Sequence, residues 1–240
     1  MKAPGFPAAP LVETIFSASF VDGLNADERD ALAEAAHGSY PIALVEKHHT
    51  LRLDGEQITV GEPETFYRLE GEDNTELLLI RPEGVNSTQL APYKSWEVLY
   101  ERFRRDLQMV WDRYPGKQVN RLAVRSINRI DVPLVGENAP YEDYLALHIR
   151  VPDEIPSIGP FNLELMLIVP EVKAMAKIRS GLTEPPVEGV GSFLLDIDLA
   201  RTQEIPENHD AVFDIFNTLR EPKNRLYRTF LTPKALEEFK

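Results

Sequence analysis

Alternation of apolar and polar positions predicts a series of β-strands in the first third of the chain. The stretch LVETIFSASF, residues 11–20, is rich in β-branched and aromatic residues and opens the fold as a strand. Further strand-like runs, separated by the turn sequences DGE and GEDN, cover residues 40–53, 65–71, 75–84 and 85–92. This succession predicts an antiparallel sheet formed by neighbouring strands.

Two stretches have the helical period. Residues 25–37 begin with Asn25 as N-cap, carry acidic residues in the first turn and end at Gly38. Residues 93–115 form the clearest helix, with apolar residues at the spacing i, i+3, i+4, i+7. That stripe consists of Trp96, Leu99, Tyr100, Phe103, Leu107, Val110 and Trp111. The polar residues predicted to lie outside the stripe are Glu101, Arg102, Arg105, Asp106 and Arg113.

The second half of the chain repeats this order. RLAVRSINRIDV, residues 121–132, is expected to be a strand, and residues 139–148 a short helix. The remaining elements are predicted as strands at 161–169, 172–180 and 191–200, a helix at 209–220, and a last strand into a short helix at 226–239. Thr232 and Pro233 suit the N-cap and first position of that last helix.

These elements predict an α+β fold in which antiparallel sheets curl against long helices. The chain would consist of two pseudo-repeated strand–helix–sheet–helix halves, residues 1–118 and 119–240, packed as one body. Sequence identity between the halves is negligible, so the duplication is inferred from element order alone.

Composition changes this picture mainly through charge. The 240 residues carry a net charge of −13, contain no cysteine, and include no apolar run of membrane-spanning length. We therefore expect a cytoplasmic protein that is not bound to membranes. Residues 92–129 are the exception to the acidic balance, with nine basic and four acidic side chains. Contact with nucleic acid through this segment is disfavoured by its acidic flanks.

Several stretches together resemble a sporadically distributed bacterial family that has no assigned activity. The matching motifs, spread over almost the whole chain, are PLVETIFSASF, YKSWEVL, VRSINRIDVP, LLDIDL and LYRTFLT. The resemblance implies an accessory bacterial protein, encoded in mobile or defence-associated loci. It supplies no catalytic residues. Ser126 departs from the pattern, because an aromatic residue is commoner there in the family.

The strand at residues 121–132 carries an unusual row of charge. Arg121, Arg125 and Arg129 share one parity and so are predicted to point to one face of the sheet. One interpretation is a ligand-binding groove for phosphate or carboxylate, since guanidinium groups donate in pairs to such anions. The other is a solvated sheet face whose arginines pair with acidic neighbours.

Other charged residues lie on the predicted strands that follow. Asp196 and Asp198 share a face of their strand, with their Cα atoms about 6.5–7 Å apart. They could hold Mg²⁺ or Mn²⁺ beside a phosphate, or they could pair with Arg125 and Arg129. Lys173, Lys177 and Arg179 are expected on one face, and Glu164 on a polar face of its own strand. Together they would form a mixed-charge surface.

Recognisable catalytic motifs are missing from the sequence. It contains no HExxH, P-loop or GxSxG pattern, and the adjacent His48 and His49 would point to opposite faces of a strand. His37 suits a helix C-terminus, whereas His148 and His209 are isolated in the sequence. Catalytic residues, and whether the protein is an enzyme at all, stay open.

Two hypotheses about function follow. The first is a non-catalytic accessory protein that binds a protein partner, in a defence or toxin-neutralising locus. Its acidic surface would speed encounter with a basic partner. The alternative is an enzyme or sensor for a small phosphate ligand such as a nucleotide, clamped by the arginine face with a divalent ion on the paired aspartates.

Overall fold

The computed structural model describes residues 10–54, 57–136, 139–149, 152, 154 and 161–239. Within residues 47–64 it describes no side chains. The strands are β1 (Leu11–Phe20), β2 (Ile42–Asp54), β3 (Gln57–Glu70), β4 (Glu76–Arg81), β5 (Gly84–Leu90), β6 (Val119–Pro133), β7 (Asn162–Val169), β8 (Ala174–Thr183) and β9 (Val190–Arg201). The helices are α1 (Ala26–Ala36), α2 (Trp96–Arg113), α3 (His209–Thr218), α4 (Arg220–Phe230) and α5 (Pro233–Glu238), with short 3-10 turns at η1 (Tyr141–Asp143) and η2 (Pro170–Val172).

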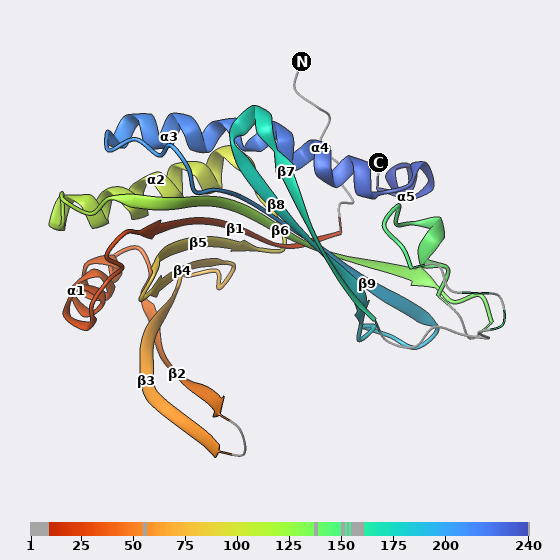
Figure 1. Cartoon of the computed structure of the whole chain (residues 1–240), viewed down its shortest axis with the longest axis horizontal. Helices are drawn as coiled ribbons and strands as arrows, with labels where there is room; N and C mark the ends of the chain where they lie inside the picture. The colour runs from red at the N-terminus through yellow and green to blue at the C-terminus, as the bar shows by residue number, and fades with distance from the viewer. Residues whose placement is uncertain are drawn as a thin grey trace. The chain divides into compact units, whose positions relative to one another are not determined.

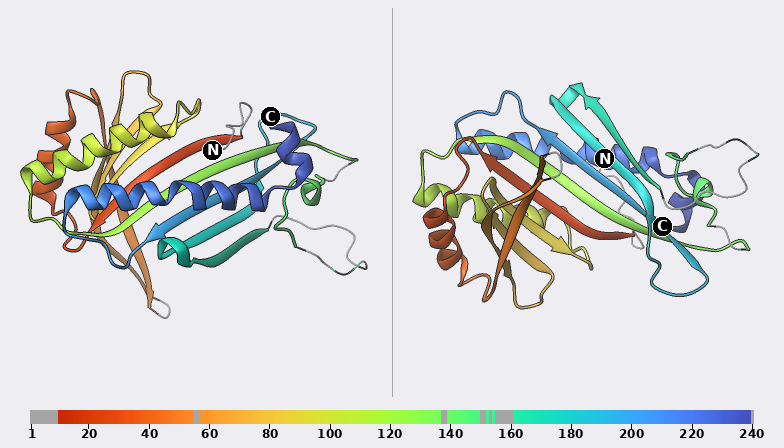
Figure 2. Two further views of the ribbon diagram at one scale, coloured as in Figure 1. Left: turned by 90° about the horizontal axis from the view of Figure 1, so that it is seen from above. Right: turned by 60° about the horizontal axis from the view of Figure 1, so that its bottom comes forward.

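The fold is α+β, as predicted, with one antiparallel nine-stranded sheet in the described part of the chain. Its strand order is β2-β3-β4-β5-β1-β6-β9-β8-β7, so β2 and β7 are the two edge strands. Figures 1 and 2 show the elements. The chain divides into two compact units, each built from segments distant in the sequence. Unit 1 comprises Met1–Thr14, Ala123–Arg201 and Asp214–Lys240, and unit 2 comprises Ile15–Leu122 and Thr202–Phe213.

Unit 2 is built around the helix α2, which packs on β5. Ser95 caps it, with its hydroxyl accepting a hydrogen bond from the backbone N–H of Val98 at 3.1 Å. The apolar stripe predicted for this helix is confirmed in its main members, which bury against Phe16 of β1. The fully buried side chains of the stripe are Leu99, Phe103, Leu107 and Val110.

Two polar residues of α2 contradict the prediction. Arg102 and Asp106 were expected outside the apolar stripe, yet both are buried. Each is matched to a polar group on β5: Arg102 donates to the carbonyl of Thr88 at 2.6 Å, and Asp106 accepts from the hydroxyl of Ser87 at 2.6 Å. Helical periodicity alone assigned them to solvent because it cannot show polar groups on the facing strand.

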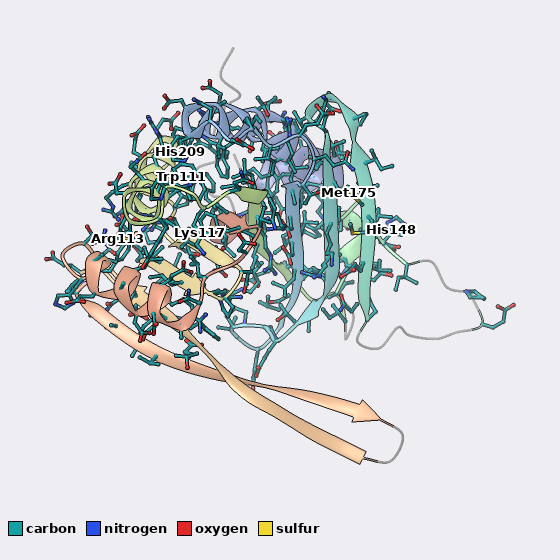
Figure 3. All side chains as sticks on the ribbon, turned by 60° about the vertical axis from the view of Figure 1, so that its left-hand side comes forward. Trp111, Arg113, Lys117, His148, Met175 and His209 are labelled. Atoms are coloured by element: carbon teal, nitrogen blue, oxygen red, sulfur yellow. The ribbon has the colours of Figure 1, made fainter. Side chains whose placement is uncertain are left out.

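The helix α1 and the ribbon of β2 and β3 complete unit 2. Asn25 forms the predicted N-cap, and its capping box with Glu28 satisfies two backbone N–H groups of α1. The helix packs on β3 and β4. The strands β2 and β3 pair over almost their whole length and extend as a two-stranded ribbon beyond β4 (Figures 1 and 3). β3 is twice as long as the predicted run at 65–71, whereas β2 agrees with its predicted bounds to within two residues.

Unit 1 buries one face of its strands. On β9 this face consists of Phe193, Leu195, Ile197 and Leu199, and on β8 of Ala174, Ala176 and Ile178. The helix α4 packs against β9. Its apolar positions follow the spacing 219, 222, 226 and 230, which gives one inward stripe. The opposite face of these strands carries the charged residues described below.

Two predicted elements of unit 1 are wrong. Residues 139–148 contain only the three-residue turn η1, because the following segment bonds to the chain between α4 and α5. There the N–H of Ala146 donates to the carbonyl of Phe230, and the N–H of Thr232 donates to that of Tyr144. The strand expected from residue 226 is instead the second half of α4, whereas α5 begins as predicted, capped by Thr232.

Candidate functional site

The arginine-rich segment is a strand, as its sequence predicts. β6 runs from Val119 to Pro133, and its even-numbered positions from Leu122 to Val132 are buried. Arg121, Arg125 and Arg129 are half-buried. The strand crosses between the units: Arg121 belongs to unit 2, where its Nη1 donates to the Ser17 hydroxyl at 3.3 Å, and the other two arginines belong to unit 1.

Strand register gathers the remaining charges of unit 1 on one face. Across β8 and β9, Lys177 lies opposite Asp198 and Arg179 lies opposite Asp196. Across β7 and β8, Glu164 lies opposite Arg179. Directly opposed residues of antiparallel strands point to the same side of a sheet. The charged face is therefore defined as Arg125, Arg129, Asp131, Glu164, Lys177, Arg179, Asp196 and Asp198.

Asp196 is the centre of this face. Arg125 donates to both of its carboxylate oxygens, from Nε at 2.8 Å and Nη2 at 2.7 Å, the paired geometry that guanidinium and carboxylate groups favour. Arg179 donates to the same Oδ2 at 3.2 Å from Nη1. Asp196 is buried, so this carboxylate holds two guanidinium groups together at the base of the face. The predicted pairing of Arg125 with Asp196 is present.

The outer part of the charged face is a second ion-pair cluster. Glu164 accepts from Nε of Arg179 at 2.9 Å and lies 3.4 Å from Nζ of Lys177. The hydrogen bond from Arg179 lowers the pKa of Glu164, and the bond to Asp196 raises the pKa of Arg125. The face is therefore a network of alternating positive and negative side chains joined by ion pairs.

Two of the predicted placements differ from the structure. Arg129 pairs with Asp131 of its own strand at 3.2 Å, and Asp131 also accepts from the Ser192 hydroxyl at 2.5 Å. The sequence pattern did not predict this partner, which lies two residues away on the same strand as Arg129. Lys173 lies before β8, in a left-handed conformation (φ 51°) that ends η2, and so it is outside the row of Lys177 and Arg179.

The proposed metal ligands Asp196 and Asp198 are the only acidic pair at this spacing on β9. In the ranges that the structure describes, no group of three or more histidine, aspartate and glutamate side chains could hold a metal ion. Asp196 is already engaged by two guanidinium groups. A Mg²⁺ ion here would need further oxygen ligands from a phosphate and from water. The metal site stays a prediction.

An apolar patch adjoins the charges, and pattern reasoning missed it. Met166 and Ile168 of β7 and Met175 of β8 lie on the charged side of the strands, with Met166 opposite Lys177 and Ile168 opposite Met175. Ile168 is 79% exposed, and each methionine is 47% exposed. Met175 is labelled on its strand in Figure 3. The sequence signal for this patch was the run NLELMLIV. Every residue in it except Asn162 and Glu164 is apolar, so both faces of the strand carry apolar side chains.

The histidines of the described side chains offer no metal site. His37 caps the end of α1, and His148 lies beside Tyr141, with ring centroids 6.5 Å apart. His209, isolated in the sequence, stacks on Trp111 with ring centroids 3.8 Å apart (Figure 3). The prediction for His48 and His49 falls on side chains outside the described set.

Comparisons with known proteins do not identify a family for this chain. No family model matches the sequence, and no curated protein matches it. Among solved structures, one comparison is with the S. pombe Pct1 RNA triphosphatase in complex with the Spt5 CTD. The identity is 8% over 97% of this chain and 84% of that chain, with a TM-score of 0.12, a value too low to support an argument about fold or function.

Among the residues that the structure describes, no helix combines the length and the apolar character needed to cross a membrane.

Proposed function

We propose that this chain is a non-catalytic accessory protein that works by binding a protein partner through the charged face and its apolar patch. The observation that carries the proposal is that exposed Met166, Ile168 and Met175 lie on the same side of the strands as a row of paired charges. Methionine and arginine are enriched at protein interfaces, and exposed apolar groups rimmed by polar residues mark such surfaces.

The pairing of the charges also favours a protein partner over a free anion. Arg125 and Arg179 are held by Asp196 and Glu164, so a phosphate would have to displace or compete with those carboxylates. A partner protein can instead add its own charges to a network that is already oriented. Side chains fixed in this way lose little conformational freedom when a partner binds.

The resemblance to a sporadically distributed bacterial family supports the setting that we propose. An accessory protein encoded in a mobile or defence-associated locus, including one that neutralises a toxin, would act on a partner in the cytoplasm. The net charge of −13 would speed encounter with a basic partner. The genes beside this one would name candidates for that partner.

Co-purification from the native host tests the proposal. Tagged wild-type protein should retain a defined partner that Ile168→Lys loses, since the added cation and the missing apolar group both disrupt the patch. The matched control is Val187→Lys, which changes a 60% exposed valine between β8 and β9 in the same unit. Loss of the partner with the control variant as well, or with neither variant, would show that the charged face is not the binding surface.

A phosphate-binding enzyme or sensor is the second candidate, and one observation favours it. Arg125 and Arg179 converge on a single oxygen of Asp196, as two guanidinium groups would on a phosphate oxygen. Thermal-shift measurements with nucleotides, with and without Mg²⁺, separate the candidates. Stabilisation that disappears in an Arg125→Ala, Arg129→Ala double variant supports this second function, and no stabilisation by any nucleotide counts against it.

The division into two pseudo-repeated halves, 1–118 and 119–240, also stays a proposal. Its support is the order of elements: the first half runs β1, α1, β2 to β5 and α2, and the second runs β6, the short turn η1, β7 to β9 and the helices α3 to α5. Superposition of matching strands and helices from the two halves tests it: Cα paths that follow each other in the same order would support duplication.

A further inference from the structure

The edge strand β2 exposes a short apolar segment. Ile42, Leu44 and Val45 are between 40 and 57% exposed, and Ala43 is exposed as well. Side chains of both parities are therefore in contact with solvent, so neither face of this segment is fully covered. Tyr40, just before the strand, is by contrast buried.

The outer edge of this segment is open. β2 pairs with β3 on one side, where Leu44 lies opposite Arg68 and Val45 opposite Tyr67, and it is the terminal strand of the sheet. An edge strand presents a row of backbone N–H and C=O groups that can pair with another chain. Natural edges are blocked by charged residues, prolines or bulges. Residues 42–45 contain none of these, although Pro41 precedes them and Glu46 follows them.

Charge around the edge indicates which chain would pair with it. From Asp22 to Glu46 the sequence has six carboxylates and one arginine, Arg29, which is buried with its guanidinium on the carbonyl of Leu24. Of the nearby cations, Lys117 pairs with Glu28 at 2.8 Å and Arg68 pairs with Glu70 at 2.8 Å. Asp30 of α1 accepts a hydrogen bond from the Tyr67 hydroxyl at 2.6 Å, and this bond raises the pKa of Tyr67. Tyr67 lies directly opposite Val45, so the helix side of the edge is acidic.

We propose that the outer edge of β2 at Ile42–Glu46 binds an extended, basic and apolar segment of a partner protein as an added strand. Its residue opposite Val45 would lie about 10 Å from the strand of Tyr67. A lysine or arginine there faces the carboxylates of α1 within roughly one Debye length. Apolar residues at the alternate positions would cover Ile42 and Leu44. A second copy of this acidic chain has the wrong charge for the same place.

This surface lies in unit 2 and is independent of the charged face of unit 1. The test uses a peptide of roughly seven residues, a usual strand length, in which valine alternates with lysine. Amide hydrogen exchange should slow at Ile42–Glu46 when the peptide is added. A peptide in which glutamate replaces lysine should have no such effect.

Variants locate the peptide. Leu44→Lys places a cation on the exposed side of the edge and should weaken binding roughly tenfold, about the effect of 1.4 kcal/mol. Val98→Lys changes a 45% exposed valine on α2 in the same unit and should bind the peptide as the wild type does. Asp30→Asn keeps the acceptor for Tyr67 but removes the charge, and it should reduce both the affinity and its dependence on salt.

Three results would overturn the proposal. The first is unchanged exchange at Ile42–Glu46 in the presence of the peptide, and the second is equal binding by Leu44→Lys and Val98→Lys. The third is slowed exchange at the same amides without peptide, together with a dimer in sedimentation, which would assign the edge to a second copy. The Ile168→Lys variant is expected to bind the peptide normally, so this test and that of the proposed function can fail separately.

Discussion

Asp196 is the residue on which the charged face depends. It is buried and accepts hydrogen bonds from two guanidinium groups. Arg125, by contrast, is half-exposed and donates to a single carboxylate, that of Asp196. Hydrogen bonds to Glu164 and to Asp196 raise the pKa of Arg179, so loss of the Asp196 carboxylate would remove one of these partners and leave two cations beside each other. The two ends of this ion pair are therefore expected to differ in their effect on stability.

We expect Asp196→Ala to reduce the free energy of unfolding by about 2–3 kcal/mol and Arg125→Ala by about 1 kcal/mol. Asp196→Ala removes the carboxylate that Arg125 and Arg179 share, whereas Arg125→Ala leaves Asp196 bonded to Arg179. Urea unfolding of both variants and of the double variant gives their coupling, expected near 1 kcal/mol. Equal losses in the single variants would show that the cations reach water easily and that Asp196 is not central.

Lys223 on α4 provides a second test at the residue scale. Burial, helped by the nearby cations Arg220 and Arg228, lowers the pKa of Lys223 from 10.5 to about 8. Between those pH values the unfolded chain holds a proton that the folded chain has lost, so this residue makes stability rise with pH. Below pH 8 both states are charged and the folded state carries the full penalty.

Lys223→Met should therefore raise the free energy of unfolding at pH 7 by about 1 kcal/mol, allowing for the partial exposure of the residue. The gain should shrink as the pH approaches 10. Chemical denaturation at several pH values measures it. Lys234→Met is the matched control, because Lys234 pairs with Asp143 at 3.0 Å and its removal should give no gain. A gain for Lys223→Met that does not change with pH would contradict the account.

At the scale of elements, α2 is fixed to its neighbours by a buried polar contact as well as by its apolar stripe. Asp106 accepts from the Tyr40 hydroxyl at 2.7 Å and from Ser87 of β5 at 2.6 Å, and Arg105 completes the group. Burial, followed by the charge of Asp106, raises the pKa of Tyr40 well above its usual range. This contact joins the helix to β5 and to the start of β2.

Asp106→Ala should cost about 3 kcal/mol or more in the free energy of unfolding, since it leaves two buried hydroxyls without an acceptor. Ser87→Ala should cost about 1 kcal/mol, because it removes one donor and leaves Asp106 with Tyr40 and Arg105. Thermal or urea unfolding of the two variants measures the difference. The reverse order, with Ser87→Ala the costlier change, would show that Asp106 is not the common acceptor.

The same elements show what the sequence could predict. Local signals sufficed for α1, α2 and α5: Asn25 and Thr232 mark the starts of α1 and α5 with caps, and the apolar period predicted α2. They failed for residues 226–231, which were predicted as a strand. These residues are instead the end of α4, whose apolar positions 219, 222, 226 and 230 form one stripe, and this helix packs against β9. They also missed Asp106, whose partners lie 19 and 66 residues away.

At the scale of the whole molecule, strand order is the feature that local patterns could not supply. The sequence predicted antiparallel strands and an α+β fold, but the single order β2-β3-β4-β5-β1-β6-β9-β8-β7 depends on pairings between distant segments. The parity of Arg125, Lys177, Arg179 and Asp196 was readable from the sequence. Their meeting on one face required the register between β8 and β9.

The affinity of the reconstituted complex tests the central claim most directly. Once the partner is purified from the native host, calorimetric titration compares wild type, Ile168→Lys and Val187→Lys. The account predicts that Ile168→Lys binds at least roughly tenfold more weakly, a loss of about 1.4 kcal/mol, while Val187→Lys matches the wild type. Equal affinity of all three proteins for the partner would contradict the claim that the charged face and its apolar patch are the docking surface.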